Sequence, residues 1–143
     1  MLADLPEGAG RVSLIKRWPA DIWFSKCVRK RANFKCEKCF VAYQHNSPGL
    51  HCAHFMSRGN WAVRFDPMNA VSLCYGHHQY FGGRPAEFMD WYAARVGLLE
   101  VERLQREAKQ PARGLKKQLP DIAKFYKRAY DEMKLGGHFA GYA

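Results

Sequence analysis

Two pairs of potential metal ligands stand out in the sequence. Cys36 and Cys39 are separated by two residues, and so are Cys74 and His77. Together they supply four thiolate or imidazole donors, which is the ligand set of a tetrahedral structural zinc site. A lone Cys-x-x-Cys could be a redox pair, so it is the second pair that favours zinc. We therefore expect a structural Zn2+ that also stabilises a small fold.

The fourth zinc ligand is left open by the spacing. His78 could close the site in place of His77, and Cys52 is a further candidate thiolate. Cys27 falls on a predicted helix face, where a small buried hydrophobe is the favoured interpretation. Five cysteines without a visible secretory signal argue against a disulfide scaffold. We expect a reducing, cytoplasmic environment.

A group of polar residues rich in histidine lies between and beside the two pairs. They are His51, His54, Asn69 and His78. Asp66 is the only carboxylate between residues 38 and 86. Imidazole, with an ordinary pKa of about 6.5, can deprotonate a water near neutral pH and can also bind a divalent metal. These properties suit the hydrolysis of a phosphodiester, in which a cation must stabilise charge on the phosphate.

The expected secondary structure sets a condition on the histidines. On a regular strand His51 and His54 face opposite sides, so they can serve one site only where the strand ends or bulges. Arg58 and Arg64 flank the turn that follows and are candidates to hold phosphates. We count Arg58 among the candidate catalytic residues and both arginines among the DNA contacts.

The hydrophobic pattern predicts an α+β fold. Pro19 opens a helix of about 12 residues that ends in basic residues. Two short strands are expected next, over 50–55 and 61–65, and the remaining elements are helical. These helices are expected over 74–81, 85–96 and 98–108, with a last one from residue 120.

The chain is strongly basic, with a formal net charge of +10 and a pI near 9.6. Residues 11–35 carry a net charge of +7 and residues 100–143 a net charge of +4. Such an excess predicts a polyanionic partner, DNA first of all, and no apolar run is long enough for a membrane span. Within the first segment we expect Arg29, Lys30 and Arg31 to contact phosphates.

The order and spacing of these residues resemble the zinc-bound HNH endonucleases of phages, nearest the NinG/Rap recombination endonucleases and more distantly the endonuclease VII junction resolvases. The matching segments are Cys36-x2-Cys39, His51-Cys-Ala-His54-Phe, Arg64-Phe-Asp-Pro-Met-Asn69 and Cys74-x2-His77-His78-Gln79. The resemblance covers about residues 34–97 and implies a small ββα-metal (His-Me finger) core. A basic arm and helix, 1–33, would precede this core, and a helical extension, 98–143, would follow it.

The resemblance implies a role for each matching residue. His54 takes the position of the general base, and Asn69 that of the asparagine that orients the backbone or the base. His51 and His78 take positions where relatives carry a metal-binding Asp and Asn, and His77 replaces a zinc-binding Cys. Imidazoles in place of oxygen ligands favour Mn2+, Ni2+, Co2+ or Zn2+ as the one catalytic divalent metal, with Mg2+ left open.

The expected function is therefore a metal-dependent DNA endonuclease. A preference for branched recombination intermediates such as four-way junctions is implied only by the resemblance. Cutting a symmetric junction twice makes a homodimer a candidate assembly. The alternative is a zinc-knuckle protein that binds nucleic acid without cutting it, although such a protein has no use for His54, Asn69 and an additional His78. A colicin-like toxin would usually bring a delivery domain, for which this chain is too short.

Overall fold

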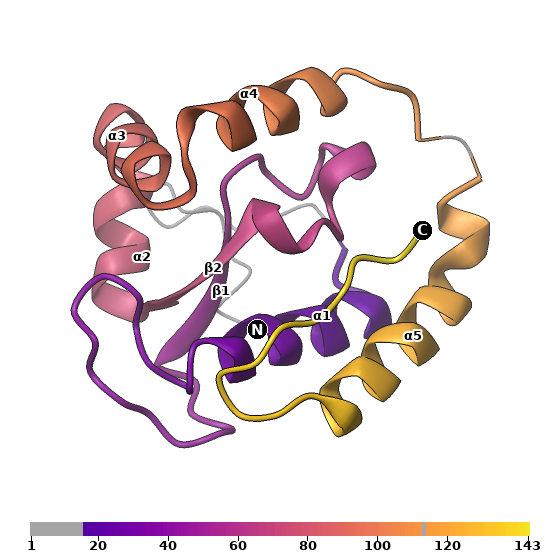
Figure 1. Cartoon of the computed structure of the whole chain (residues 1–143), viewed down its shortest axis with the longest axis horizontal. Coiled ribbons are helices and arrows are strands. Elements are labelled where there is room, and N and C mark those ends of the chain that lie inside the picture. The colour runs from indigo at the N-terminus through magenta and orange to yellow at the C-terminus, as the bar shows by residue number, and fades with distance from the viewer. Residues whose placement is uncertain (1–15, 113) are drawn as a thin grey trace.

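The computed structural model describes residues 16–112 and 114–143, and it shows an α+β fold, as the sequence predicts (Figure 1). Residues 11–15 of the basic N-terminal arm lie outside the described residues. The helices are α1 (Pro19–Arg31), α2 (Tyr75–Gly82), α3 (Pro85–Val96), α4 (Leu98–Glu107) and α5 (Leu119–Glu132), and the strands are β1 (Leu50–His54) and β2 (Ala70–Cys74). Within the described part, no helix is both long and apolar enough to cross a membrane.

The two strands form an antiparallel pair that leads directly into α2. Leu50 pairs with Cys74 at one end of the register and His54 with Ala70 at the other. The strand expected over 61–65 was wrong, because Trp61–Val63 is a 3-10 turn and the second strand is Ala70–Cys74. Every residue of this strand is buried, so it lacks the alternation of polar and apolar residues that reveals a half-buried strand.

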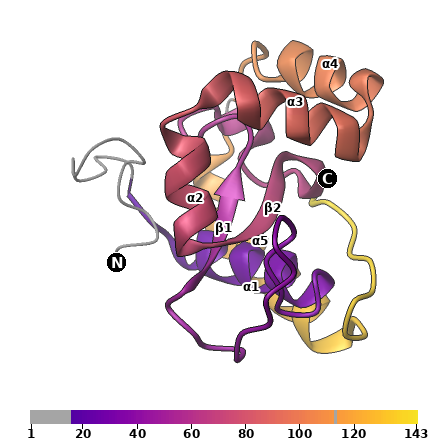
Figure 2. The same cartoon turned by 90° about the vertical axis from the view of Figure 1, so that its left-hand side faces the viewer.

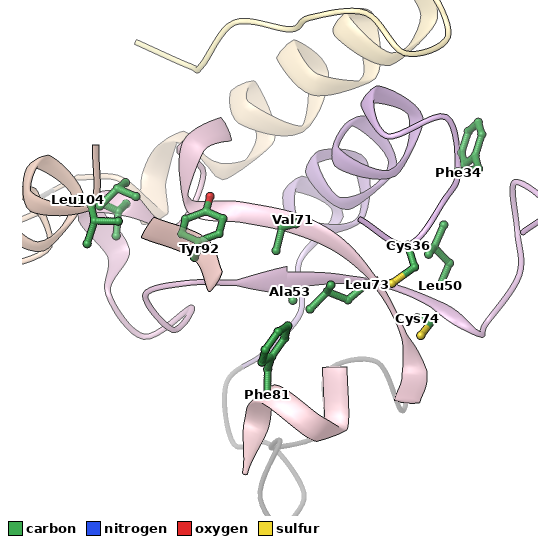
Figure 3. Close-up of a cluster of buried hydrophobic side chains, with 12 residues drawn as sticks. Phe34, Cys36, Leu50, Ala53, Val71, Leu73, Cys74, Phe81, Tyr92 and Leu104 are labelled. Atoms are coloured by element: carbon green, nitrogen blue, oxygen red, sulfur yellow. The ribbon is translucent and has the colours of Figure 1, made fainter. Parts of the chain in front are cut away.

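Two apolar clusters lie on either side of the strand pair. The first joins the strands to α2, α3 and α4 through residues such as Leu73, Phe81 and Leu104 (Figure 3). The second joins them to α1 and α5 through residues such as Phe24 and Tyr126. Figure 2 shows α2 beside β1 and β2, with α1 and α5 packed together below them. The predicted N- and C-terminal flanks thus share their cores with the strands.

The start of α1 is fixed by Asp21. Its carboxylate accepts the N–H of Trp18 at 2.8 Å, which caps the helix, and Pro19 supplies the fixed φ that suits a first turn. The same carboxylate meets Arg64, which is only 1% exposed. The Nε and Nη2 atoms of Arg64 donate to the two oxygens of Asp21 at 2.9 and 2.8 Å. This bidentate ion pair joins α1 to the segment between the strands.

The remaining donors of Arg64 are also used inside the protein. Its Nη1 donates to the carbonyl of Arg58 at 3.2 Å and its Nη2 to that of Lys16 at 2.7 Å, and the guanidinium lies 4.3 Å from the ring centre of Trp61. Arg64 therefore holds the fold together, and its prediction as a DNA contact is corrected.

The basic end of α1 also turns inward. Arg29 is buried and donates to the carbonyls of Ser25 and His45. Arg31 donates to two carbonyls next to β2, those of Pro67 at 2.9 Å and Ala70 at 2.8 Å. Arg29 is buried and its guanidinium serves carbonyl groups of the fold, so its prediction as a phosphate contact is corrected. Arg31 is half-exposed and has further N–H donors, so its phosphate contact stays a prediction.

Lys30, like Arg31, has a half-exposed side chain. Its ammonium donates to the carbonyl of Tyr130 in α5 at 2.6 Å, which links the two helices. An ammonium has three N–H donors, so this bond leaves donors for a further acceptor.

The substitution Asp21→Asn tests the importance of the buried ion pair. It leaves the Arg64 guanidinium buried without its counter-charge, and we expect the free energy of unfolding to fall by about 3–5 kcal/mol. Urea unfolding of the zinc-saturated protein measures this change. The control is Glu87→Gln, which removes the exposed pair with Arg84 and should cost less than about 1 kcal/mol. Equal, small losses in both variants would contradict the structural role.

Candidate metal centre and histidine cluster

The two predicted pairs of zinc ligands meet in space, and we call the segments that carry them, 36–39 and 74–77, the first and second knuckle. The ligand atoms of Cys36, Cys39, Cys74 and His77 all lie within 4.8 Å of one another. The Nδ1 atom of His77 is 3.7 Å from the sulfur of Cys36 and 3.3 Å from that of Cys74. Tetrahedral zinc with ordinary bond lengths separates such N and S ligands by about 3.6 Å. The cluster can therefore hold a zinc ion with three thiolates and one imidazole.

Local backbone geometry shapes each half of this cluster. Phe40 adopts a positive φ of 64° directly after Cys39, and its N–H closes the knuckle on the carbonyl of Cys36 at 2.7 Å. On the other side, the sulfur of Cys74 caps α2 by accepting the N–H of His77 at 3.4 Å. The first knuckle is thus a tight turn, whereas the second is the first turn of a helix.

Hydrogen bonds prepare Cys36 to be a thiolate. Burial opposes the charged form, but N–H donors, among them those of Lys38 and Cys39, together with His77 outweigh it. The net effect lowers the pKa of Cys36 from 9.0 to about 7. A lowered thiol pKa favours the form that binds metal.

The fourth ligand, which the sequence left open, is His77. His78 is the next residue along α2, and neighbouring residues of a helix point about 100° apart. Its ring is therefore turned away from the sulfurs and meets His51 of β1 instead. Cys52 is half-buried on β1 and is not part of the cluster.

His51 and His78 form a close pair across β1 and α2. Their Nδ1 atoms are 2.9 Å apart, and the Nε2 atom of His51 lies 3.0 Å from the carbonyl oxygen of Pro48. That carbonyl can only accept, so His51 carries its proton on Nε2 and leaves the Nδ1 lone pair free to accept from His78. Burial, followed by the charges of His51 and His54, lowers the pKa of His78 to about 4.

His54 is held in one tautomer. Its Nε2 lies 3.0 Å from the carbonyl oxygen of Arg64, so Nε2 carries the proton and Nδ1 has the lone pair. The ring centre is 5.8 Å from that of Phe24 in α1. Burial, and then the positive charge of Arg58, lower the pKa of His54 to about 4, so its imidazole is neutral near pH 7. His54 is also the last residue of β1 and is still paired with Ala70. Its ring contacts α1, whereas His51 contacts α2, so the two histidines face different helices.

Asn69 fixes the segment between the strands. It is fully buried; its Nδ2 donates to the carbonyls of Met56 and Val63, and its Oδ1 accepts the N–H of Met56 at 2.7 Å. These contacts hold the segment that presents the Arg64 carbonyl to His54.

Arg58 is buried beside the same segment. It is 8% exposed, and its Nη1 lies 4.0 Å from the Asp21 carboxylate. After burial, the positive charge of Arg58 is the next cause of the lowered pKa of His54. The contact of Arg58 with a phosphate stays a prediction. Sequence reasoning assigned no structural role to Asp21, although it is the only acid among eight basic residues in 11–35.

Comparison with known proteins adds no family to this picture. No family model, no curated protein and no solved structure matches the chain. The functional conclusion therefore rests on the residues themselves, on their spacing and on the geometry described above.

The zinc site is tested by Cys39→Ser. Cys39 is exposed, so the substitution removes a ligand without opening a cavity. We expect the purified variant to lose most of its zinc, and a structural zinc is worth on the order of 10 kcal/mol of folding free energy in small domains. A large fall in the melting temperature should follow. Zinc content is measured colorimetrically after denaturation, and Cys52→Ser is the matched control that keeps its zinc. A Cys39→Ser protein with full zinc content would refute this ligand set.

Proposed function

We propose that the protein is a metal-dependent DNA endonuclease of the HNH type. The observation that carries the proposal is the pairing of His51 and His78 between β1 and α2, with His54 held in a single tautomer at the end of β1. A zinc-capable cluster at the start of α2 fixes the helix that carries His78. The order of these residues also supports the proposal, through the resemblance of residues 34–97 to the phage HNH endonucleases.

The histidine pair fits a divalent metal. Two nitrogen ligands at ordinary bond lengths of about 2.1 Å and at right angles are about 3.0 Å apart. The observed separation of the His51 and His78 Nδ1 atoms is 2.9 Å. The carbonyl of Pro48 would orient His51 through its other nitrogen, as such partners do for metal-bound imidazoles. When bound, the metal supplies a positive charge that stabilises the phosphate and the leaving oxygen.

His54 is suited to act as the general base. With its Nε2–H held by the Arg64 carbonyl, its Nδ1 can take a proton from a water that attacks phosphorus. The carbonyl also favours the imidazolium that results, because it accepts a stronger hydrogen bond from a charged donor. Asn69 and Arg64 act as positioning residues, since they hold the segment that contacts His54.

The proposed substrate is DNA, and branched DNA is the proposed preferred form. The net charge of +10 supports a polyanionic substrate, and the resemblance to recombination endonucleases supports the branched form. The alternative function is that of a zinc-knuckle protein that only binds nucleic acid. Such a protein would have no use for the histidine pair or for the fixed tautomer of His54.

A cleavage assay separates the two functions. The protein is incubated with plasmid, linear duplex and a synthetic four-way junction, in Mn2+, Ni2+, Co2+ or Mg2+ and without added metal. We expect metal-dependent cutting, strongest on the junction, and a loss of at least about 100-fold in His54→Ala, since general-base catalysis contributes 100- to 10,000-fold.

The controls are chosen so that each result is informative. His138→Ala removes an exposed histidine far along the sequence from the cluster and should cut like the parent protein. His51→Ala should lose metal-dependent cutting while keeping its zinc, because His51 lies outside the Cys3His cluster. Binding of DNA without cutting in any of the metals would overturn the proposal in favour of the binding protein.

A further inference from the structure

A compact group of lysines and aromatic rings lies where α1 meets α5. We call it the Trp23–Tyr130 surface, and it consists of Trp23, Lys26, Lys30, Lys127 and Tyr130. The rings of Trp23 and Tyr130 are 5.8 Å apart. All of these side chains are half-buried except that of Lys127, which is exposed.

Each ammonium of this surface lies near a ring. Lys26 is within reach of both rings, at 5.6 Å from Trp23 and 5.9 Å from Tyr130. Lys127 is 5.3 Å from the ring centre of Trp23, and Lys30 is 4.5 Å from that of Tyr130. All of these distances are within the range of about 6 Å over which a cation is attracted to an aromatic ring.

Charge on this surface is far from balanced. Among residues 16–112 and 114–143, the carboxylate that forms an ion pair with it is that of Asp131, which is 3.0 Å from the Nζ atom of Lys127. Lys124 and Arg128 are exposed on the same helix and add further positive charge. Gathering like charges costs free energy in the isolated protein, and a polyanion would relieve that cost.

The rings restrict the side-chain conformations of these lysines, whereas surface lysines normally sample many rotamers. A lysine loses up to about 2 kcal/mol of rotamer entropy when it is immobilised, and a lysine already held against a ring has lost part of this in advance. A set of pre-ordered ammonium groups is a better ligand for a row of phosphates than the same number of mobile ones.

We propose that the Trp23–Tyr130 surface binds the phosphate backbone of duplex DNA, as a second contact outside the histidine cluster. The choice of DNA among polyanions rests on the proposed function, but the binding itself does not require cutting. In this account the DNA contacts of the basic helix α1 are made by Lys26 and Lys30, with Lys127 from α5, whereas Arg29 serves the fold.

The test measures the salt dependence of binding. Fluorescence anisotropy follows a labelled duplex with His54→Ala protein in buffer without added divalent metal, so that cleavage plays no part. Each lost phosphate contact lowers the slope of log K against log salt concentration by about 0.9. The Lys26→Gln and Lys127→Gln double variant should therefore lower the slope by about 1.8 and weaken binding at low salt. The matched control removes the same charge from exposed Lys109 and Lys117 and should keep the slope.

A second pair of variants tests the role of the rings. Trp23→Leu keeps every charge but releases Lys26 and Lys127, so the affinity should fall several-fold with little change in slope. Trp23→Phe keeps a ring and should restore most of the affinity; thermal unfolding verifies that both variants are folded.

Three results would overturn the proposal. One is an unchanged slope in the Lys26 and Lys127 double variant, and another is an equal loss in the Lys109 and Lys117 control. The third is binding to vesicles containing phosphatidylserine without binding to duplex DNA, which would make this a membrane-facing surface. Failure of cleavage alone would leave these measurements intact and would count only against the nuclease function.

Discussion

The buried ion pair between Asp21 and Arg64 is the constraint on which the rest of the structure depends. Asp21 caps α1 with the same carboxylate that receives two hydrogen bonds from Arg64. Arg64 in turn donates to the carbonyls of Arg58 and Lys16 and offers its own carbonyl to His54. One carboxylate therefore connects the start of a helix, the segment between the strands and the orientation of an imidazole.

This arrangement explains why the terminal helices cannot be regarded as mere additions to a zinc-bound core. The second apolar cluster includes α1 and α5 together with Phe65 and Ala70, which lie before and after a second 3-10 turn, Pro67–Asn69. Tyr126 of α5 donates to the carbonyl of Phe65, the neighbour of Arg64, at 2.6 Å. The helices thus position the segment that holds His54, and the zinc cluster positions the helix that carries His78. His54 and His78 are thus held by different parts of the fold.

The sequence predicted the parts of the structure that depend on local pattern. The three cysteines of the zinc-capable cluster, β1 and the helices follow from spacing, turn residues and periodicity, and all three are present. β2 was missed because a fully buried strand shows no alternation. The inward direction of Arg64 was missed because its partner lies 43 residues away, and such a pairing exists only after folding. The choice between His77 and His78 depends on how α2 is rotated about its axis, because neighbouring residues of a helix point about 100° apart.

The central claim is that His51 and His78 hold a divalent metal, separate from the zinc. Anomalous diffraction from crystals grown with Mn2+, recorded at the manganese and zinc edges, tests it most directly. We expect zinc among Cys36, Cys39, Cys74 and His77, and manganese about 2.0–2.3 Å from the Nδ1 atoms of both His51 and His78. Zinc alone, with no manganese at the histidine pair, would contradict this account.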